Sequence, residues 1–282
     1  MSSVRVAEAL AAARGQGLDR LDAQLLLARV LQRPREWLIA HDDAPLSAGQ
    51  QQRFAADCAR RAAGEPLAYL LGEREFHGLM LQVGPAVLVP RPDTETLVDW
   101  ALELLADAPG TAPAMADLGT GSGAIALALK HARPDARVCA VEISPAALAV
   151  ARANGQRLGL DVQWLAGSWW QPFQDRRFDL VSSNPPYIAA GDPHLPALRH
   201  EPLQALSPGG DGLSDLRHIV QAAPLHLQPG GWLLLEHGHD QAEAVRALLL
   251  QAGLTQVTTR RDLAGRPRCS GGRRPEHAPA GA

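Results

Sequence analysis

The sequence has few cysteines and no long hydrophobic run. Its three cysteines, Cys58, Cys139 and Cys269, are widely spaced among 282 residues and form no CxxC pair. This pattern argues against a disulfide framework and favours reduced thiols. No apolar run reaches the roughly 18 residues of a membrane span, and the N-terminus lacks a hydrophobic signal region. We therefore expect a cytoplasmic protein that does not enter the membrane.

Lysine is also scarce. The formal net charge is −3, and Lys130 is the only lysine, so almost every cation is an arginine. Such a chain has no overall attraction for polyanions. This weakens the case for a DNA or RNA substrate, although a local basic patch remains compatible with it.

Changes in hydrophobic periodicity divide the chain into four parts. Residues 1–72 have helical spacing, with Asp19 and Ser47 as candidate helix N-caps, and we interpret them as a helical, partner-docking domain. Residues 73–92 form a predicted hairpin, turning near His77 and Gly78, and a proline-rich linker. The interval 93–265 is the predicted catalytic domain. Residues 266–282 are rich in glycine, proline and arginine, so we expect a disordered tail.

Strand and helix patterns alternate through the third part. The predicted strands are Ala114–Leu118, Arg137–Glu142, Val162–Ala166, Phe178–Ser182, Trp232–Glu236 and Leu254–Arg260, and the predicted helices are Ala124–His131, Pro145–Leu158, Asp215–His226 and Gln241–Ala252. This order predicts an α/β fold with a doubly wound, largely parallel sheet. Ligands bind such sheets at the carboxyl ends of the strands.

The first strand of this region leads into a glycine-rich turn. Asp117 and Leu118 are followed by glycines at the alternate positions Gly119, Gly121 and Gly123, with Thr120 and Ser122 between them. Glycines allow a tight turn and close approach of the backbone to a ligand. Glu142 ends the next strand about 20 residues later, where a carboxylate can bind the hydroxyls of a ribose. The pair indicates a nucleoside ligand, and a dinucleotide remains possible at this point.

A second motif follows the fourth strand, namely Asn184-Pro185-Pro186-Tyr187. Proline lacks a backbone N–H and restricts the residue before it to extended conformations. The turn therefore offers hydrogen-bond acceptors, the Asn184 amide oxygen and the Pro185 carbonyl, which suit a flat NH2 group. Taken alone the motif is equally compatible with a surface turn. Together with the glycine turn it indicates S-adenosylmethionine and an amino acceptor in one cleft.

These motifs give the chain a resemblance to the HemK/PrmC family, the glutamine methyltransferases of peptide-chain release factors. The resemblance rests on residues 89–95, 117–127, 183–188, 201–203 and 235–238 and extends from the N-terminal helices to about Asp262. It implies a class I, Rossmann-like methyltransferase domain that transfers a methyl group from S-adenosyl-L-methionine to the side-chain nitrogen N5 of the glutamine in the Gly-Gly-Gln motif. S-adenosyl-L-homocysteine is then the second product, and translation termination is the process affected.

The resemblance also implies roles for individual residues. Asn184 and Pro185 would be catalytic and, with Pro186 and Tyr187, would bind the glutamine amide. The expected cofactor-binding residues are Asp117, Gly119, Thr120, Gly121, Ser122, Gly123, Glu142, Trp169 and Asn184. Ser168 stands where the family often has an acid before the tryptophan, which leaves an adenine contact from position 168 open. We expect a monomer without a metal or a direct nucleic-acid partner.

Two other interpretations remain at this stage. An amino-methyltransferase acting on a nucleic-acid base, or on a glutamine of a ribosomal protein, would share the acceptor turn. A non-catalytic module could retain the nucleoside pocket alone. The run Glu236-His237-Gly238-His239 matches no standard zinc motif, and a strand end is the better interpretation. Arg91, between two prolines, is either a linker elbow or the rim of a cleft, and the role of Glu201 stays open.

Overall fold

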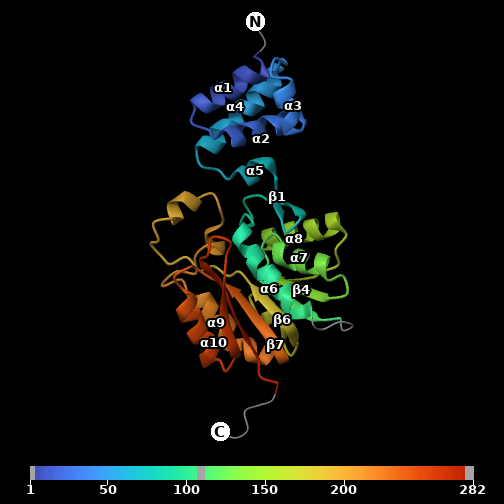
Figure 1. The fold of residues 1–282 in the computed structure, drawn as a ribbon, viewed down its shortest axis with the longest axis vertical. Coiled ribbons are helices and arrows are strands. Elements are labelled where there is room, and N and C mark those ends of the chain that lie inside the picture. The colour runs from blue at the N-terminus through green and yellow to red at the C-terminus, as the bar shows by residue number, and fades with distance from the viewer. Residues whose placement is uncertain (1–3, 107–111, 277–282) are drawn as a thin grey trace. The chain divides into compact units, whose positions relative to one another are not determined.

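The computed structural model describes residues 4–106 and 112–276, and the chain divides into two compact units between Arg74 and Glu75 (Figure 1). The first unit is helical, as predicted. Its helices are α1 (Val6–Gly15), α2 (Arg20–Leu31), α3 (Arg35–Ala40), α4 (Ala48–Ala62) and α5 (Leu67–Leu71). The two predicted N-caps are confirmed, because Asp19 accepts from the backbone N–H of Leu21 and Ser47 accepts from that of Gln50.

The predicted hairpin is also present. It consists of β1 (Glu73–Phe76) and β2 (Leu79–Gln82), and it turns at His77 and Gly78, which both have positive φ values. Gly78 adopts this conformation without steric cost because it has no Cβ.

The second unit contains, within the described residues, a seven-stranded sheet. Its strand order is β5-β4-β3-β6-β7-β9-β8. The strands are β3 (Ala114–Leu118), β4 (Arg137–Glu142), β5 (Gln163–Ala166), β6 (Phe178–Ser183), β7 (Leu227–Glu236), β8 (Thr255–Arg261) and β9 (Pro267–Arg273). Strands β3 to β7 are parallel, and β9 is antiparallel to both neighbours. The predicted doubly wound α/β fold is therefore confirmed.

Helices cover both faces of this sheet (Figure 1). They are α6 (Glu95–Ala106), α7 (Ala124–Ala132), α8 (Pro145–Leu158), α9 (Ser214–His226) and α10 (Ala242–Gln251). Side chains of α6 and α7 pack with Met115 and Leu180 in one core, whereas α9 and α10 pack with Leu118 and Val181 in another. Successive strand residues point to opposite faces, so β3 and β6 contribute to both cores. Among the described residues, none of the helices has the length and apolar character that crossing a membrane requires.

The expectation of a disordered tail from residue 266 is wrong for Pro267–Arg273. These residues form β9, which pairs with β7 and with β8. The glycines are there because the packing is close: a Cβ on Gly271 would lie 2.5 Å from Leu234 Cδ2 and 2.8 Å from Trp100 Cη2. Residues 277–282 lie outside the described part of the chain.

Asn154 connects three segments of the second unit. This residue of α8 is fully buried, and its Oδ1 accepts from the backbone N–H of Gln82 at 2.7 Å. Its Nδ2 donates to the carbonyls of Gln82 and Ser122, both at 3.0 Å. The side chain thus ties β2 and the glycine-rich turn to the helix, and its loss leaves the buried Ser122 carbonyl without this donor.

Replacement of Asn154 by alanine is expected to lower the free energy of unfolding by roughly 2–4 kcal/mol, since three hydrogen bonds are lost, one to the buried Ser122 carbonyl and two to the part-buried backbone of Gln82. Urea unfolding followed by tryptophan fluorescence measures the change. The matched control is Gln156→Ala, because Gln156 is exposed on the same helix. Equal unfolding midpoints for the two variants would contradict this account of Asn154.

Candidate active site

A cavity of about 430 Å³ lies at the carboxyl ends of the parallel strands. Eight residues predicted for the site line it: Gly119, Thr120, Gly121, Ser122, Glu142, Trp169, Asn184 and Pro186. They follow or end β3, β4, β5 and β6, which meet at this edge of the sheet. The glycine turn and the acceptor turn therefore share one cavity. Asp117, Gly123, Pro185 and Tyr187 are not part of its wall.

The backbone of the glycine-rich turn is in the conformation that glycine favours. Gly119, Gly121 and Gly123 have φ values of +71°, +57° and +85°. The N–H groups of Gly119 and Thr120 both donate to the carbonyl of Val141 at 2.9 Å, which holds the turn against β4. Gly123 stands directly before α7, where a Cβ would lie 3.0 Å from Trp164 and 3.1 Å from Leu127. Gly123 thus serves the packing of the helix.

Glu142 fixes the second wall of the cavity. Its Oε2 accepts from the N–H of Gly121 and its Oε1 from the N–H of Ser144, both at 2.9 Å. These bonds hold the carboxylate at the end of β4 beside the glycine turn. Each carboxylate oxygen has a second lone pair, so both can still accept from hydroxyls of a ligand.

Asp117 lies behind the turn and not in the cavity wall. Its carboxyl is almost fully buried, accepting from the hydroxyl of Thr120 at 2.6 Å and from that of Ser182 at 3.4 Å. Burial raises the pKa of Asp117 to about 6, against the opposing effect of these hydrogen bonds. The structure therefore gives Asp117 contacts with the turn and with β6.

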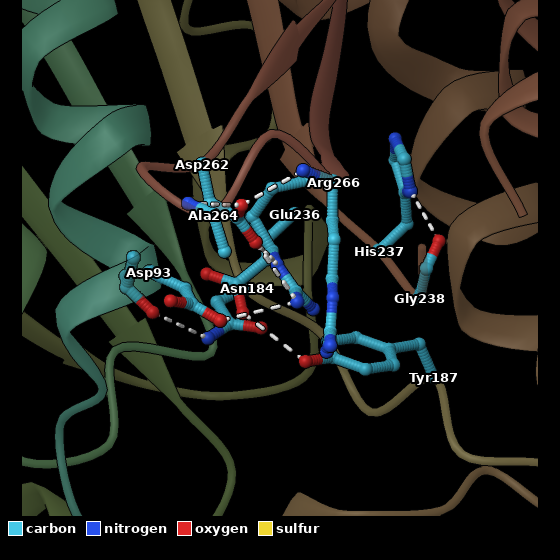
Figure 2. Close-up of polar contacts among 11 residues, drawn as sticks. Asp93, Asn184, Tyr187, Glu236, His237, Gly238, Asp262, Ala264 and Arg266 are labelled. Carbon is cyan, nitrogen blue, oxygen red and sulfur yellow. Dashed lines mark hydrogen bonds and ion pairs between the residues drawn. The ribbon is translucent and has the colours of Figure 1, made fainter. Parts of the chain in front are cut away.

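The acceptor turn divides into two parts that face different ways. Asn184 follows β6 directly, lines the cavity, and donates from Nδ2 to the hydroxyl of Thr94 at 3.3 Å. Pro185 is buried. The Tyr187 hydroxyl donates to Oε1 of Glu236 at 3.2 Å, and Figure 2 shows this phenol directed at the Glu236 carboxyl. Tyr187 thus anchors the turn to the end of β7, whereas the resemblance implied that it contacts the glutamine amide.

Trp169 packs over the start of the glycine turn. A Cβ on Gly119 would lie 3.0 Å from Cζ3 of the indole, so only glycine allows this close approach. Ser168 lines the cavity next to Trp169. The polar group at position 168 is therefore placed beside the ligand space, as a hydroxyl in place of a carboxylate.

An ion pair joins two loops of the cavity, and the sequence had not decided the role of either residue. The buried Glu201 carboxylate accepts from the N–H of Val89 at 3.0 Å and pairs with the guanidinium of Arg91. Arg91 and Pro202 both line the cavity, so Arg91 belongs to the rim of a cleft. The only sign of this contact in the sequence was an acid before a proline. Such a pair does not specify a hydrogen-bond partner more than 100 residues away.

Thr94 and Glu236 also belong to the surroundings of the site, and neither was singled out for it. Thr94 lines the cavity, and Glu236 ends β7. Among the residues that the structure describes, no three His, Cys, Asp or Glu side chains gather in a way that could hold a metal ion.

Comparison with known proteins identifies the family. Residues 4–72 match the PrmC N-terminal domain, and residues 94–213 match the methyltransferase small domain. A release factor glutamine methyltransferase of Bordetella pertussis is 54% identical over 91% of this chain and 95% of its own length. One from Xylella fastidiosa is 50% identical over 95% of this chain and 98% of its own length. The chain belongs to the release factor glutamine methyltransferase family.

Solved structures support the fold of this family member at low identity. The catalytic domain of human METTL16, in complex with an RNA hairpin, has a TM-score of 0.58 and 17% identity, covering 80% of this chain and 84% of that one. A 16S rRNA guanine methyltransferase of Thermus thermophilus has a TM-score of 0.53 and 19% identity, covering 72% of this chain and 49% of that one. At such identity the likeness concerns the class I methyltransferase fold alone.

In this family member, the burial of Asp117 makes stability depend on pH. Its pKa of about 6 in the folded chain exceeds the ordinary 3.8, so folding favours the protonated acid. The favourable contribution is complete below about pH 4 and is lost as the pH rises to about 6, a change on the order of 3 kcal/mol. Asp117→Asn removes this titration. Unfolding free energies measured from pH 4 to 7 should therefore fall more steeply for the wild type than for the variant, and parallel curves would show that Asp117 titrates normally.

Proposed function

We propose that this chain transfers the methyl group of S-adenosyl-L-methionine to the side-chain nitrogen N5 of the glutamine in the Gly-Gly-Gln motif of peptide-chain release factors. The observation that carries the proposal is the common cavity of the two motifs. Asn184 lines the same cavity as the glycine turn and Glu142, in a chain about half identical to release factor glutamine methyltransferases. Action in the cytoplasm, as a monomer and without a metal, belongs to the same proposal.

The residues of the cavity fit the cofactor. Glu142 is a buried carboxylate at a strand end, where it can accept from ribose hydroxyls, and the glycine turn precedes the positive end of the α7 dipole. Trp169 offers an indole face, and Ser168 a hydroxyl, to the adenine. When bound, the cofactor supplies an electrophilic methyl group on a sulfonium. We assign Asp117 and Gly123 the supporting roles of holding the turn and packing the helix.

Asn184 and Pro185 would do the remaining chemistry by alignment. A carboxamide nitrogen is a poor nucleophile because its lone pair is delocalised into the carbonyl. Asn184 Oδ1, on the cavity wall, would hold one of its two hydrogens, and the carbonyl of the adjoining Pro185 is the proposed acceptor for the other, so that the nitrogen is directed toward the methyl group. Both oxygens also favour the positive charge that develops on the nitrogen. Such alignment can lower a barrier by about 7–11 kcal/mol. Asn184 is neutral and is not an ordinary base, so the proton leaves to solvent after transfer.

Pro186 and Tyr187 would shape this acceptor site in different ways. Pro186 lines the cavity and can contact the glutamine side chain. Tyr187 acts at a distance from it, by fixing the end of the turn on Glu236. Gln241 assists, because its Nε2 donates to the Tyr187 carbonyl at 2.9 Å.

Asn184→Ala is expected to abolish methylation while S-adenosylmethionine binding largely persists, because the variant removes an acceptor for the glutamine amide and leaves the glycine turn and Glu142 in place. Recombinant release factors, DNA and RNA are incubated separately with labelled cofactor. The proposal expects label only in release factors, with one methyl group on one glutamine by mass spectrometry. Near-normal methylation by the variant, or label confined to nucleic acid, would overturn the assignment.

Gly119→Ala tests the contact between the glycine turn and Trp169. The new Cβ meets the indole at 3.0 Å and imposes a φ of +71° on alanine, so S-adenosylhomocysteine affinity should fall at least about tenfold. The control is Gly159→Ala, where φ is +66° but no atom lies within 4 Å of the added Cβ. Calorimetric titration of both variants separates steric loss at the cavity from general backbone strain. Similar affinities in the two would show that the indole contact is unimportant.

A further inference from the structure

The chain between β6 and α9 makes a long excursion from the sheet (Figure 1). It begins with the acceptor turn and comes back to the cavity at residues 201–208, here called the return segment, where Pro202, Gln204 and Ser207 line the wall. The residues that fit the cofactor follow or end β3, β4 and β5, which all lie on one side of β6 in the sheet. The return segment follows β6 itself, so it belongs to the acceptor side of the cavity.

One end of the return segment is fixed beside the acceptor turn by hydrogen bonds with the backbone. The carbonyl of Leu206 accepts from the N–H of Ile188 at 2.9 Å, and the Ser207 hydroxyl donates to the carbonyl of Ile188 at 2.6 Å. Ile188 directly follows Tyr187, the last residue of the acceptor turn. This end of the segment is therefore held without the use of charge.

The other end is held by Glu201, whose side chain is only 3% exposed. Its Oε2 accepts from the N–H of Val89 at 3.0 Å, and its Oε1 accepts from the guanidinium of Arg91. A carboxylate removed from water depends on such partners, because an unpaired buried charge is costly. The pairing therefore fixes the start of the return segment to residues 89–91.

Residues 89–91 are a stiff support for this contact. Val89 precedes one proline and Arg91 lies between two, so both are restricted to extended conformations. Val89 is 5% exposed, and its N–H is a fixed donor. Three residues beyond Arg91, the hydroxyl of Thr94 accepts from Nδ2 of Asn184 at 3.3 Å. The segment 89–94 thus contacts the return segment through Glu201 and the acceptor residue through Thr94.

We propose that Glu201 is a positioning residue that holds the return segment on Val89 and Arg91 and thereby sets the width of the acceptor side of the cavity. The proposal rests on the proposed function, since the group received there is the glutamine carboxamide. A fixed width keeps the carboxamide in line with Asn184. If the return segment shifts, the same groups still meet the substrate but align it less well, and small misplacements of reacting groups are costly.

Glu201→Gln keeps the size of the side chain and an oxygen for the N–H of Val89, and it removes the charge that pairs with Arg91. The expected result is about a 10- to 100-fold lower kcat/KM for release factor methylation, from the loss of a charge-assisted hydrogen bond. The affinity for S-adenosylhomocysteine should be unchanged, because the cofactor side keeps its contacts. The matched control is Glu243→Gln, an exposed glutamate of α10 outside the cavity, with wild-type kcat/KM.

Arg91→Gln provides a second test, measured at saturating S-adenosylmethionine. This variant leaves the Glu201 carboxylate buried without its counter-charge, so it should lose more activity than Glu201→Gln. The double variant Arg91→Gln, Glu201→Gln removes that uncompensated charge and should be more active than Arg91→Gln alone. Two residues with separate structural roles would not give this recovery. Arg91→Lys retains the charge and should lose less activity than Arg91→Gln.

Three results would overturn the proposal. They are wild-type kcat/KM in Glu201→Gln, a loss of S-adenosylhomocysteine affinity in Glu201→Gln that equals its loss of kcat/KM, and losses that multiply in the double variant. Melting temperatures identify any variant that fails to fold. If Arg91→Gln is among them, Glu201→Gln and Arg91→Lys decide.

The outcomes also separate this inference from the proposed function. If the wild-type chain transfers no methyl group to release factors, the proposed function fails before any variant is compared. If the wild type is active and Glu201→Gln equals it, the inference alone fails and the proposed function stands.

Discussion

The parallel pairing of β6 with its two neighbours is the constraint on which the site depends. In this register Ser183 lies beside Leu118 of β3 and beside Leu235 of β7. The next residues along the three strands are Asn184, Gly119 and Glu236. Parallel strands end at the same edge of a sheet, so the acceptor turn necessarily lies between the glycine turn and the buried glutamate. A shift of one residue would turn every side chain to the opposite face and separate the three.

Burial of carboxyl groups around the cavity is costly and serves orientation. Asp117 and Glu236 are almost completely buried, and burial raises the pKa of each to about 6. Both occupy positions where they face hydroxyl groups, Thr120 and Ser182 for Asp117, and Tyr187 for Glu236. A buried acceptor determines where each hydroxyl points its hydrogen. Desolvation of the two carboxyl groups thus costs free energy, and their hydrogen bonds with the hydroxyl groups fix the geometry of the two turns that line the cavity.

Glycine has two different roles in this chain, and the difference explains why a disordered tail was wrongly predicted at Pro267–Arg273. In the turn after β3, glycines supply positive φ values and room for a ligand, and alternate spacing made that evident. In β9, Gly271 is buried between Leu234 and Trp100 of other elements. Composition alone suggested disorder there, because the close approach that requires glycine involves residues distant in sequence. The same holds for Glu201, whose partners Val89 and Arg91 are more than 100 residues away.

The sequence by itself determined the elements and the chemistry of the site. Local periodicity placed β3 and β4 at their observed bounds, and the two turn motifs contained some of the residues that line the cavity. Only the tertiary structure decided how those residues face. Tyr187 is directed at Glu236 and away from the cavity, and Asn184 is held by Thr94 from another segment. The physical reason is that backbone conformation follows from neighbouring residues, whereas the direction of a hydrogen bond depends on a partner that only folding brings near.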